Sequence, residues 1–422
     1  MPSTFSTSKL QSWYESYKQQ SNLLIDCNGG IRTGCEENGV TKVESMGWAM
    51  IIAAYMGDKD DFDGLYRFYK SKRQGHGMMA WKTTCSGIVD GGSASDGDLD
   101  VAFSLVVATW QWGDEYRESA EDEINTVKKL ITSCSGTSVL FGGFGGNSGY
   151  GGCSCTDISY YTPAFFRYFA EFTDDEAWTT LADDTYTVLD NAANAGTGLV
   201  PNWHTFDGGS CSMGEHRYAY DACRVPWRIA LDYLWNGNEE AKAWCTKISD
   251  WAYGVGPANI KAGYELNGTP TASYQNMSFV GGFAVAAMCN SQEISDAFGK
   301  QIASLRFDTY WYHAFLGTCY MLTMSGNMWH DRIDEDGINR DKTVAGESTP
   351  AVAVRNGNLI ITGIPHGSAI LLTSLDGRLV RRSITTGPRL QMSTAAVKSG
   401  CYLVSIRDNN GKVRVKEMIA VY

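Results

Sequence analysis

Three carboxylates alternate over five residues, immediately before a strongly apolar stretch. Asp96, Asp98 and Asp100 stand in the segment ASDGDLD, which continues as VAFSLVVATWQW. One such residue is enough to cap a helix, because a single side-chain oxygen accepts from the free backbone N–H groups of the first turn. An EF-hand calcium loop is a second interpretation, but counting from Asp96 puts Val101 and Val107 where that loop needs Gly and Glu. Crowded carboxylates beside an apolar helix repel each other, so paired acid and base chemistry is a third interpretation.

The elements that must position these residues follow a repeating pattern over the first 330 residues. A strongly apolar segment ends at a turn-forming pair, and an amphipathic segment follows it. The turns begin at Gly57, Gly113, Asp174, Gly237 and Asn290, a spacing of 53 to 63 residues. With a leading segment at 9–19 and a last one at 309–325, we expect about twelve helices, paired as six hairpins in an (α/α)6 barrel.

A different pattern begins after Trp329. Residues 334–350 are polar and are expected to form a linker. Short β-type runs then occur at 351–354, 359–362, 369–373, 402–406 and 413–421. Hairpin-forming pairs stand at 376–377 and 410–411. We therefore expect a helical domain over 1–333, a linker over 334–350 and a small all-β sandwich-like module over 351–422.

Charge and hydropathy exclude several classes of protein. The net charge of −12 disfavours binding to phosphate backbones, so no nucleic-acid partner is expected. No apolar stretch reaches 18 residues, so no membrane span is expected. Residues 341–422 hold 11 Lys and Arg against 5 Asp and Glu, whereas residues 1–340 hold 24 against 42. All 13 Trp also precede residue 341, which favours two domains of different kinds.

The twelve cysteines are many for a cytosolic protein. Six of them stand in loop-like contexts: Cys27, Cys35, Cys134, Cys153, Cys155 and Cys211. Four others stand in apolar segments, where a buried thiol is expected: Cys223, Cys245, Cys289 and Cys319. We expect at least one disulfide among the loop cysteines and an oxidising compartment, with the pairing left open. No CxxC pair occurs, so neither zinc nor another metal is expected.

The first residues, Met1-Pro2-Ser3-Thr4, lack the basic and apolar regions of a signal peptide. The protein is therefore either cytosolic or has lost its signal peptide from this sequence. We favour a secreted or cell-surface location.

Several segments together resemble glycoside hydrolase family 8. Its signature, Ala-(Ser/Thr)-Asp-(Ala/Gly)-Asp before an apolar helix ending in Trp, is similar to residues 94–113. Residues 43–50 (VESMGWAM) resemble the family's catalytic-acid segment, and residues 220–228 (YDACRVPWR) resemble its catalytic-base segment. Residues 159–164 and 325–327 also look like family segments, so the resemblance covers about 8–330 in order. It implies an (α/α)6 barrel that hydrolyses β-1,4-linked polysaccharides with inversion and without a cofactor.

The resemblance implies a role for each acid. Glu44 matches the general acid, and the apolar run after it would raise its pKa as an acid requires. A first-turn helix residue is the simpler interpretation of Glu44 alone. Asp221 matches the general base, and Arg224 three residues later would keep it ionised, although a plain surface ion pair is also possible. Asp96 matches the residue that holds the distorted sugar ring, with Asp98 as the fallback, whereas Asp100 is expected to be structural.

Aromatic side chains should line the substrate cleft, because the C–H faces of sugars stack on rings. Trp81, in MMAWK, matches a tryptophan of a family subsite. Tyr160 or Tyr161, and Tyr310 or Tyr312, are candidates near the water and the cleaved sugar. Trp203 is a weaker cleft candidate, and core packing is the alternative for each of these residues.

Two features depart from the family pattern. Ser45 replaces a Gly beside Glu44 and adds a hydroxyl that could alter a subsite. The segment 142–155 is expected to form a loop that is longer and richer in glycine than the family's, and that could reshape one end of the cleft. Both departures bear on the substrate and not on the reaction type.

The tail has a resemblance of its own. Residues 371–382 and 399–421 look like the sorting module of the type IX secretion system. A carbohydrate-binding module is the alternative, but the tail has no Trp with which to build a stacking platform.

The sequence thus predicts an inverting endo-acting hydrolase of β-1,4-linked polysaccharide, with a cellulose-type glucan favoured. Xylanase and chitosanase are alternatives within the family, and a non-catalytic carbohydrate-binding surface protein is the alternative of another class. We expect a monomer whose only other partner is the secretion machinery.

Overall fold

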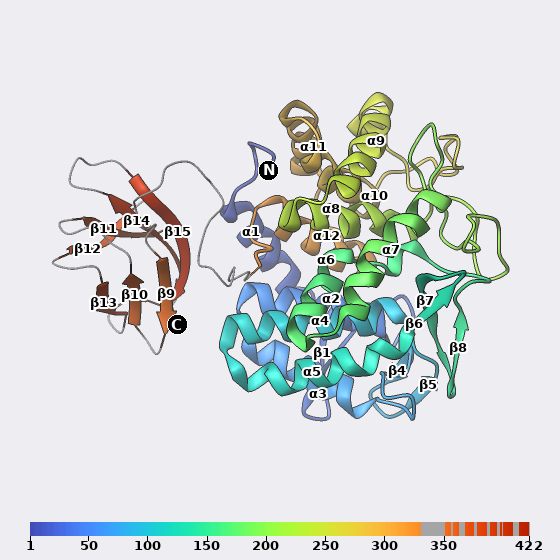
Figure 1. The fold of residues 1–422 in the computed structure, drawn as a ribbon, viewed down its shortest axis with the longest axis horizontal. Coiled ribbons are helices and arrows are strands. Elements are labelled where there is room, and N and C mark those ends of the chain that lie inside the picture. The colour runs from blue at the N-terminus through green and yellow to red at the C-terminus, as the bar shows by residue number, and fades with distance from the viewer. Residues whose placement is uncertain are drawn as a thin grey trace. The chain divides into compact units, whose positions relative to one another are not determined.

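The computed structural model divides the chain into two compact units, Met1–His330 and Asp331–Tyr422 (Figure 1). It describes residues 1–330, 351–355, 358–362, 368–374, 378–385, 389–394, 397–398, 400–407 and 413–421. The predicted linker at 334–350 and the predicted turns at 376–377 and 410–411 lie outside the described residues.

The first unit is built from twelve α-helices within residues 1–330. Their bounds are α1 Thr7–Lys18, α2 Val43–Met56, α3 Lys59–Ser71, α4 Ser95–Trp112, α5 Arg117–Val127, α6 Pro163–Thr173, α7 Glu176–Ala192, α8 Val225–Asn236, α9 Glu239–Val255, α10 Met277–Ala286, α11 Gln292–Ser304 and α12 Trp311–Met324. The even-numbered helices pack against one another in a closed ring, α2-α4-α6-α8-α10-α12-α2. Each packs most extensively against one outer helix, which is the next helix in the chain for α2 to α10 and is α1 for α12. This is the (α/α)6 barrel that the sequence predicted.

Burial explains why the inner and outer helices differ in sequence. In α2 and α10 nearly every residue is buried, so neither helix has a polar face. The outer α3 and α9 bury only one stripe of side chains. A helix surrounded by neighbours must be apolar all round, whereas an outer helix keeps a polar face for water.

The five predicted turns join the inner helices α2, α4, α6, α8 and α10 to the outer helices that follow them. Gly57 ends α2 and Gly237 ends α8, both in the left-handed conformation that glycine adopts without strain. The next residue then caps the outer helix: Asp58 accepts from the Asp61 N–H and Asn238 from the Ala241 N–H. The glycine that ends the inner helix is therefore followed directly by the residue that caps the outer helix, which keeps the connection short.

Small antiparallel sheets fill the longer connections. They contain β1 Leu24–Cys27, β2 Gly30–Thr33, β3 Val40–Lys42, β4 Lys82–Thr84, β5 Ile88–Asp90, β6 Ile131–Cys134, β7 Thr137–Gly145 and β8 Ser148–Gly151. Most of the segment 142–155, expected to be a loop, is thus the hairpin β7–β8, which lies at the edge of the helical unit in Figure 1. Its glycines hid the strand pattern, because they supply no alternating side chains.

The second unit is all-β over its described residues. Its strands are β9 Ala351–Arg355, β10 Asn358–Thr362, β11 Ala369–Ser374, β12 Leu379–Ile384, β13 Arg389–Ser393, β14 Gly400–Arg407 and β15 Val413–Val421. They form two antiparallel sheets, β13-β10-β9 and β12-β11-β14-β15. Alternate residues such as Leu359, Ile370 and Val404 form its own core. The expected β-module is confirmed, with β12 and β13 in addition to the five predicted runs.

Three disulfides link loops of the first unit: Cys27–Cys85, Cys134–Cys153 and Cys155–Cys211. Five of these six cysteines were among the loop cysteines, whereas the pairing of Cys85 was not anticipated. Cys35 keeps a free thiol. The four cysteines expected to be buried thiols are free and buried. Among the described residues, no helix is long and apolar enough to cross a membrane.

Candidate active site

The site begins where α2 and α4 cross with almost no space between their backbones. A Cβ placed on Gly47 would lie 2.6 Å from the Cβ of Asp100, and one placed on Gly97 would lie 2.5 Å from the carbonyl carbon of Val43. Only glycine fits at this crossing. Because Glu44 and Asp96 stand on the first turns of these two helices, the crossing brings the predicted acid next to the predicted ring-holding residue.

Glu44 has the electrostatic environment of a proton donor. Burial, reinforced by the nearby carboxylate of Asp96, raises its pKa to about 7. Lys42 and Arg224 act in the opposite direction. Its Oε2 atom is buried and accepts no hydrogen bond from the residues that the structure describes. A large fraction of Glu44 is therefore protonated near neutral pH.

Arg224 lies at the centre of the site and is 2% exposed. It forms an ion pair with Asp96, which is 1% exposed, and donates from Nη2 to Asp221 Oδ1 at 3.1 Å. The 3₁₀ turn Ala222–Arg224 at the start of α8 holds Asp221 and Arg224 on one side of the chain. One guanidinium thus joins two of the three predicted acids.

Asp221 differs from the other acids in its exposure. Its side chain is 35% exposed, so it is accessible to a water molecule. The pKa of Asp221 is raised overall, because burial and the charge of Asp96 outweigh Arg224, which lowers it. Arg224 therefore works toward the ionised form that a general base needs.

Asp157 is a further acid of the site that the sequence analysis missed. It lies at the start of the 3₁₀ turn Ile158–Tyr160, is fully buried, and accepts from the Ser159 N–H at 2.8 Å. Its Oδ2 lies 3.7 Å from Arg224 Nη2. Burial and the charge of Asp221 raise its pKa well above the ordinary value. Its place directly before a segment resembling the family was the only available clue.

The other two acids of the segment 96–100 point into the protein. Asp98 is fully buried and accepts from the Tyr69 hydroxyl at 2.7 Å and the Met79 N–H at 3.2 Å. Burial raises its pKa to about 8. Asp100 forms a buried ion pair with Arg228. Asp96 is thus the acid of this segment that pairs with Arg224, whereas Asp98 is bonded to Tyr69 and the Met79 backbone.

Aromatic rings surround Arg224. Its guanidinium lies 5.9 Å from the Trp48 ring and 5.5 Å from the Tyr160 ring. Tyr160 packs edge-on against Trp203 at 5.5 Å. Tyr312 donates its hydroxyl to the Tyr220 carbonyl, next to Asp221. Tyr160, Trp203 and Tyr312 therefore lie at the acid cluster, and their role in lining a substrate cleft stays a prediction.

The remaining aromatic candidates lie in different settings. Trp81, which precedes β4, and Tyr310, which precedes α12, both keep exposed surface. Tyr161 has none, and its hydroxyl accepts from the Leu140 N–H at 2.7 Å. Tyr161 is therefore a packing residue of the barrel, and of the pair Tyr160 and Tyr161 only Tyr160 contacts the cluster.

The β7–β8 hairpin is attached to the start of α4. The Ser93 N–H donates to the Phe144 carbonyl at 2.9 Å, and Ser95 Oγ donates to the Phe141 carbonyl at 2.7 Å. Tyr150 of β8 donates its hydroxyl to the Ser93 carbonyl at 2.9 Å. Burial and the charges of Asp96 and Glu44 raise the pKa of Tyr150. The glycine-rich segment thus reaches the site, as expected.

The Ser45 departure does not reach the acids. Ser45 is fully buried, shares a hydrogen bond of 2.6 Å with Thr33 Oγ1 and donates to the Lys42 carbonyl at 2.8 Å. Its hydroxyl therefore serves the packing of α2 on β2. The predicted change in a subsite is not found at this residue.

No cluster of three or more His, Cys, Asp or Glu with metal-binding geometry occurs among the described residues. The many carboxylates of the site are instead neutralised by Arg224, Arg228 and protonation. The arrangement is one of acids and bases held at different pKa values, which is suited to proton transfer.

Comparison with known proteins agrees with this geometry. Residues 1–329 match the sequence profile of the family described as Glycosyl hydrolases family 8. The chain belongs to glycosyl hydrolase family 8. The family match covers the whole helical unit that carries the acid cluster.

Family 8 relatives include several glucanases. Endoglucanase C of Ruminiclostridium cellulolyticum is 35% identical over 64% of this chain and 61% of its own length. Beta-glucanase of Niallia circulans is 30% identical over 76% of this chain and 84% of its own. The matched region thus spans less than two thirds of the endoglucanase. A solved beta-1,3-1,4-glucanase from Paenibacillus sp. X4 has a TM-score of 0.69 at 28% identity, covering 78% of this chain and 95% of that one.

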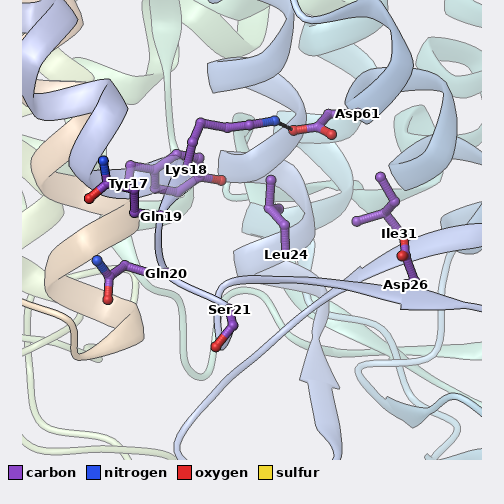
Figure 2. Close-up of a pocket in the computed structure, with 9 residues that line it drawn as sticks. All are labelled: Tyr17, Lys18, Gln19, Gln20, Ser21, Leu24, Asp26, Ile31 and Asp61. Atoms are coloured by element: carbon purple, nitrogen blue, oxygen red, sulfur yellow. Dashed lines mark hydrogen bonds and ion pairs between the residues drawn. The ribbon is translucent and has the colours of Figure 1, made fainter.

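One surface cavity of about 320 Å³ lies away from the acid cluster, at the end of α1 (Figure 2). Figure 2 shows the Lys18 side chain extended toward Asp61, with Leu24 and Ile31 drawn below the pair. None of the predicted site residues lines it. This cavity therefore has no part in the chemistry of the family 8 site.

Proposed function

We propose that the protein is an inverting endo-β-1,4-glucanase, with Glu44 as general acid, Asp221 as general base and Asp96 holding the sugar ring. The observation that carries the proposal is that the carboxyl groups of Glu44 and Asp221 have different environments. Both lie near Arg224 and Asp96. Glu44 is buried with a pKa of about 7, whereas Asp221 is one-third exposed and paired with a guanidinium. Pairs of acids with different environments are the pattern of acid–base catalysis.

The two carboxyls divide the reaction between them. The protonated Glu44 donates to the glycosidic oxygen as the bond breaks, which makes the departing sugar a neutral alcohol. The ionised Asp221 takes a proton from a water molecule that attacks the anomeric carbon from the opposite face. The reaction ends with Glu44 ionised and Asp221 protonated, so exchange with solvent resets both groups.

Arg224 and Asp96 support the transition state in this scheme. Arg224 compensates the charge of Asp96 and Asp221, so that neither carboxylate forces the other to take a proton. Asp96 lies where it favours the distorted ring with developing positive charge at the anomeric carbon. Trp81 and Tyr310, which keep exposed surface, offer ring faces for the neighbouring sugars.

A glucan is the favoured substrate because the relatives named above are called endoglucanase, beta-glucanase and beta-1,3-1,4-glucanase. The test is release of reducing ends from carboxymethyl-cellulose, mixed-linkage glucan, xylan and chitosan, with the anomer of the product followed by NMR. We expect the fastest release from a β-glucan and an inverted product. Release of reducing ends from xylan or chitosan alone would assign that polysaccharide as the substrate. No release from any of the four polysaccharides would favour a non-catalytic carbohydrate-binding protein.

We further propose that the protein acts outside the cytoplasm as a monomer and that the β-module serves its secretion. The three disulfides and a polymeric substrate support an extracellular location. Fusion of residues 331–422 to a periplasmic reporter, in a host with type IX secretion, should bring the reporter to the cell surface. If the reporter stays in the periplasm, the β-module has another role, and retention on glucan columns would assign it to carbohydrate binding.

A further inference from the structure

We propose that Lys42 is a positioning residue of the site, whose ammonium group holds the rings of Trp81 and Trp311 and places a fixed positive charge beside Glu44. This inference rests on the proposed function, since it assigns Lys42 to the same reaction.

The position of Lys42 in the fold brings it to both rings. It ends β3 and directly precedes α2, the helix that carries Glu44. Its Nζ lies 5.5 Å from the centre of the Trp311 ring and 6.0 Å from that of Trp81. These distances lie within the range in which an ammonium group is attracted to the face of a ring.

The two rings come from distant parts of the chain, and each is tied to the acid cluster. The Trp81 carbonyl accepts from the Val43 N–H at 3.1 Å, which joins Trp81 to the first turn of α2. Trp311 begins α12 and stacks on Trp48 at 6.1 Å, and Trp48 in turn lies under Arg224. Lys42 therefore closes a chain of contacts that runs from the acid's own helix to the guanidinium.

The charged groups around Lys42 keep its ammonium protonated. It forms an ion pair with Glu36, and its side chain is only 14% exposed. Burial lowers its pKa, but Glu36 and Glu44 outweigh burial and raise the pKa overall. Cys35 is also near Lys42. Burial raises the pKa of this thiol to about 11, so the thiol stays neutral and does not act as a negatively charged partner of Lys42.

The charge of Lys42 acts on Glu44 among few competing groups. The other groups that interact electrostatically with Glu44 are Asp96 from α4, Arg224 before α8 and Tyr150 from β8. Asp96 raises the pKa of Glu44, whereas Lys42 and Arg224 lower it. Removal of Lys42 therefore leaves Glu44 protonated up to a higher pH.

Lys82 provides a matched control. It pairs with Lys42 across β3 and β4, its Nζ lies 4.7 Å from the Trp81 ring, and it has its own acidic partner in Glu37. It is not among the groups that shift the pKa of Glu44. Lys82→Met thus removes an ammonium group from the same ring without removing the charge beside the acid.

The experiment compares Lys42→Met, Lys42→Arg and Lys82→Met with the parent protein on soluble glucan over a range of pH. For Lys42→Met we expect a KM about 3- to 10-fold higher. The alkaline limb of the pH profile of kcat/KM should shift to higher pH by on the order of half a unit, because Glu44 then loses its proton at a higher pH. Lys42→Arg should restore the limb, since Arg keeps the charge and stacks on rings. Lys82→Met should raise KM and leave the limb in place.

A second readout does not need activity. In protein labelled with ¹³C-Glu, the carboxyl resonance that disappears in Glu44→Gln reports the titration of Glu44. We expect its midpoint to rise in Lys42→Met and to stay in Lys82→Met. If Lys42→Met and Lys82→Met had the same alkaline limb of kcat/KM and the same titration midpoint for Glu44, the inference would be overturned. If the parent protein cleaves no glycan, the proposed function fails, while the titration of Glu44 still decides the role of Lys42.

Discussion

Asp96 and Arg224 stand 128 residues apart in the chain and form an ion pair in which both side chains are at least 98% buried. A buried pair of this kind needs further hydrogen bonds to offset the loss of hydration. Arg224 has them: Nη2 donates to Ser159 Oγ at 2.8 Å and to Asp221 Oδ1 at 3.1 Å. The pair therefore fixes the start of α8 against the start of α4.

Replacement of Arg224 by Lys should impair catalysis more than folding. A lysine keeps one positive charge but cannot contact Asp96, Ser159 and Asp221 at once, since it lacks the planar fork of the guanidinium. We expect kcat to fall by on the order of 10² or more, and the melting temperature to fall by a few degrees. Arg224→Met should be much less stable, by about 3–5 kcal/mol, because Asp96 and Asp157 then lose their counter-charge. Near-normal kcat for Arg224→Lys would show that only charge is needed.

Glu44→Gln should abolish proton donation without unfolding the protein. The amide has the size of the carboxyl, and Glu44 Oε2 has no hydrogen-bond partner among the described residues. We expect a loss on the order of 10³-fold or more on glucan, where the leaving sugar needs a proton. Activity on an aryl glycoside with an acidic phenol as leaving group should fall less. The measurement compares the loss of kcat/KM on the two substrates. Equal losses on both would argue against the acid role.

Asp221→Asn should behave differently from Glu44→Gln. The attacking water then lacks a base, so every substrate should lose activity to a similar extent, irrespective of its leaving group. Asp96→Asn should lose less, mainly in kcat, because a distorted ring is favoured toward the transition state. Steady-state kinetics on the same two substrates separate these outcomes. If Asp221→Asn stayed active while Asp157→Asn did not, Asp157 would be the base.

Asp98 should make the stability of the protein depend on pH. Burial raises its pKa from the ordinary value of 3.8 to about 8, so between these values the native state holds a proton that the unfolded state releases. Stability should therefore decrease as pH rises through this window, by up to about 1.4 kcal/mol per pH unit for one such group. Asp98→Asn should flatten this slope, as measured by urea unfolding at pH 5 and pH 8. Parallel slopes in the two proteins would show that Asp98 is ionised in the native state.

Six of the twelve cysteines should react with a thiol reagent in denatured, unreduced protein, because the other six form disulfides. Twelve reactive thiols would contradict the disulfides and the oxidising compartment.

Reduction of the disulfides should lower the free energy of unfolding, and the two disulfides that close the longest loops should contribute most. Separations of 58 and 56 residues correspond to about 4 kcal/mol each, and a separation of 19 to about 3 kcal/mol, in the chain-entropy model.

The barrel was predictable because its signals are local. Turn-forming pairs such as Gly57-Asp58 and the all-apolar inner helices are visible along the chain, and the structure places them as expected. The site was predictable only through its resemblance to a family. Asp157 was missed since one aspartate in a loop has no distinguishing pattern, and its burial beside Arg224 depends on contacts between distant segments. The β7–β8 hairpin was missed because glycine leaves no strand pattern.

The crossing at Gly47 and Gly97 has a consequence for how the protein can change over evolution. Neither helix can gain a side chain at this point without pushing the other away, so the two motifs are fixed as a unit although 50 positions separate them in the sequence. A library that randomises one motif while holding the other constant would recover almost nothing but glycine at either position. Diversity in substrate preference must instead arise from segments that leave the crossing untouched, and the β7–β8 hairpin is the natural place to seek it.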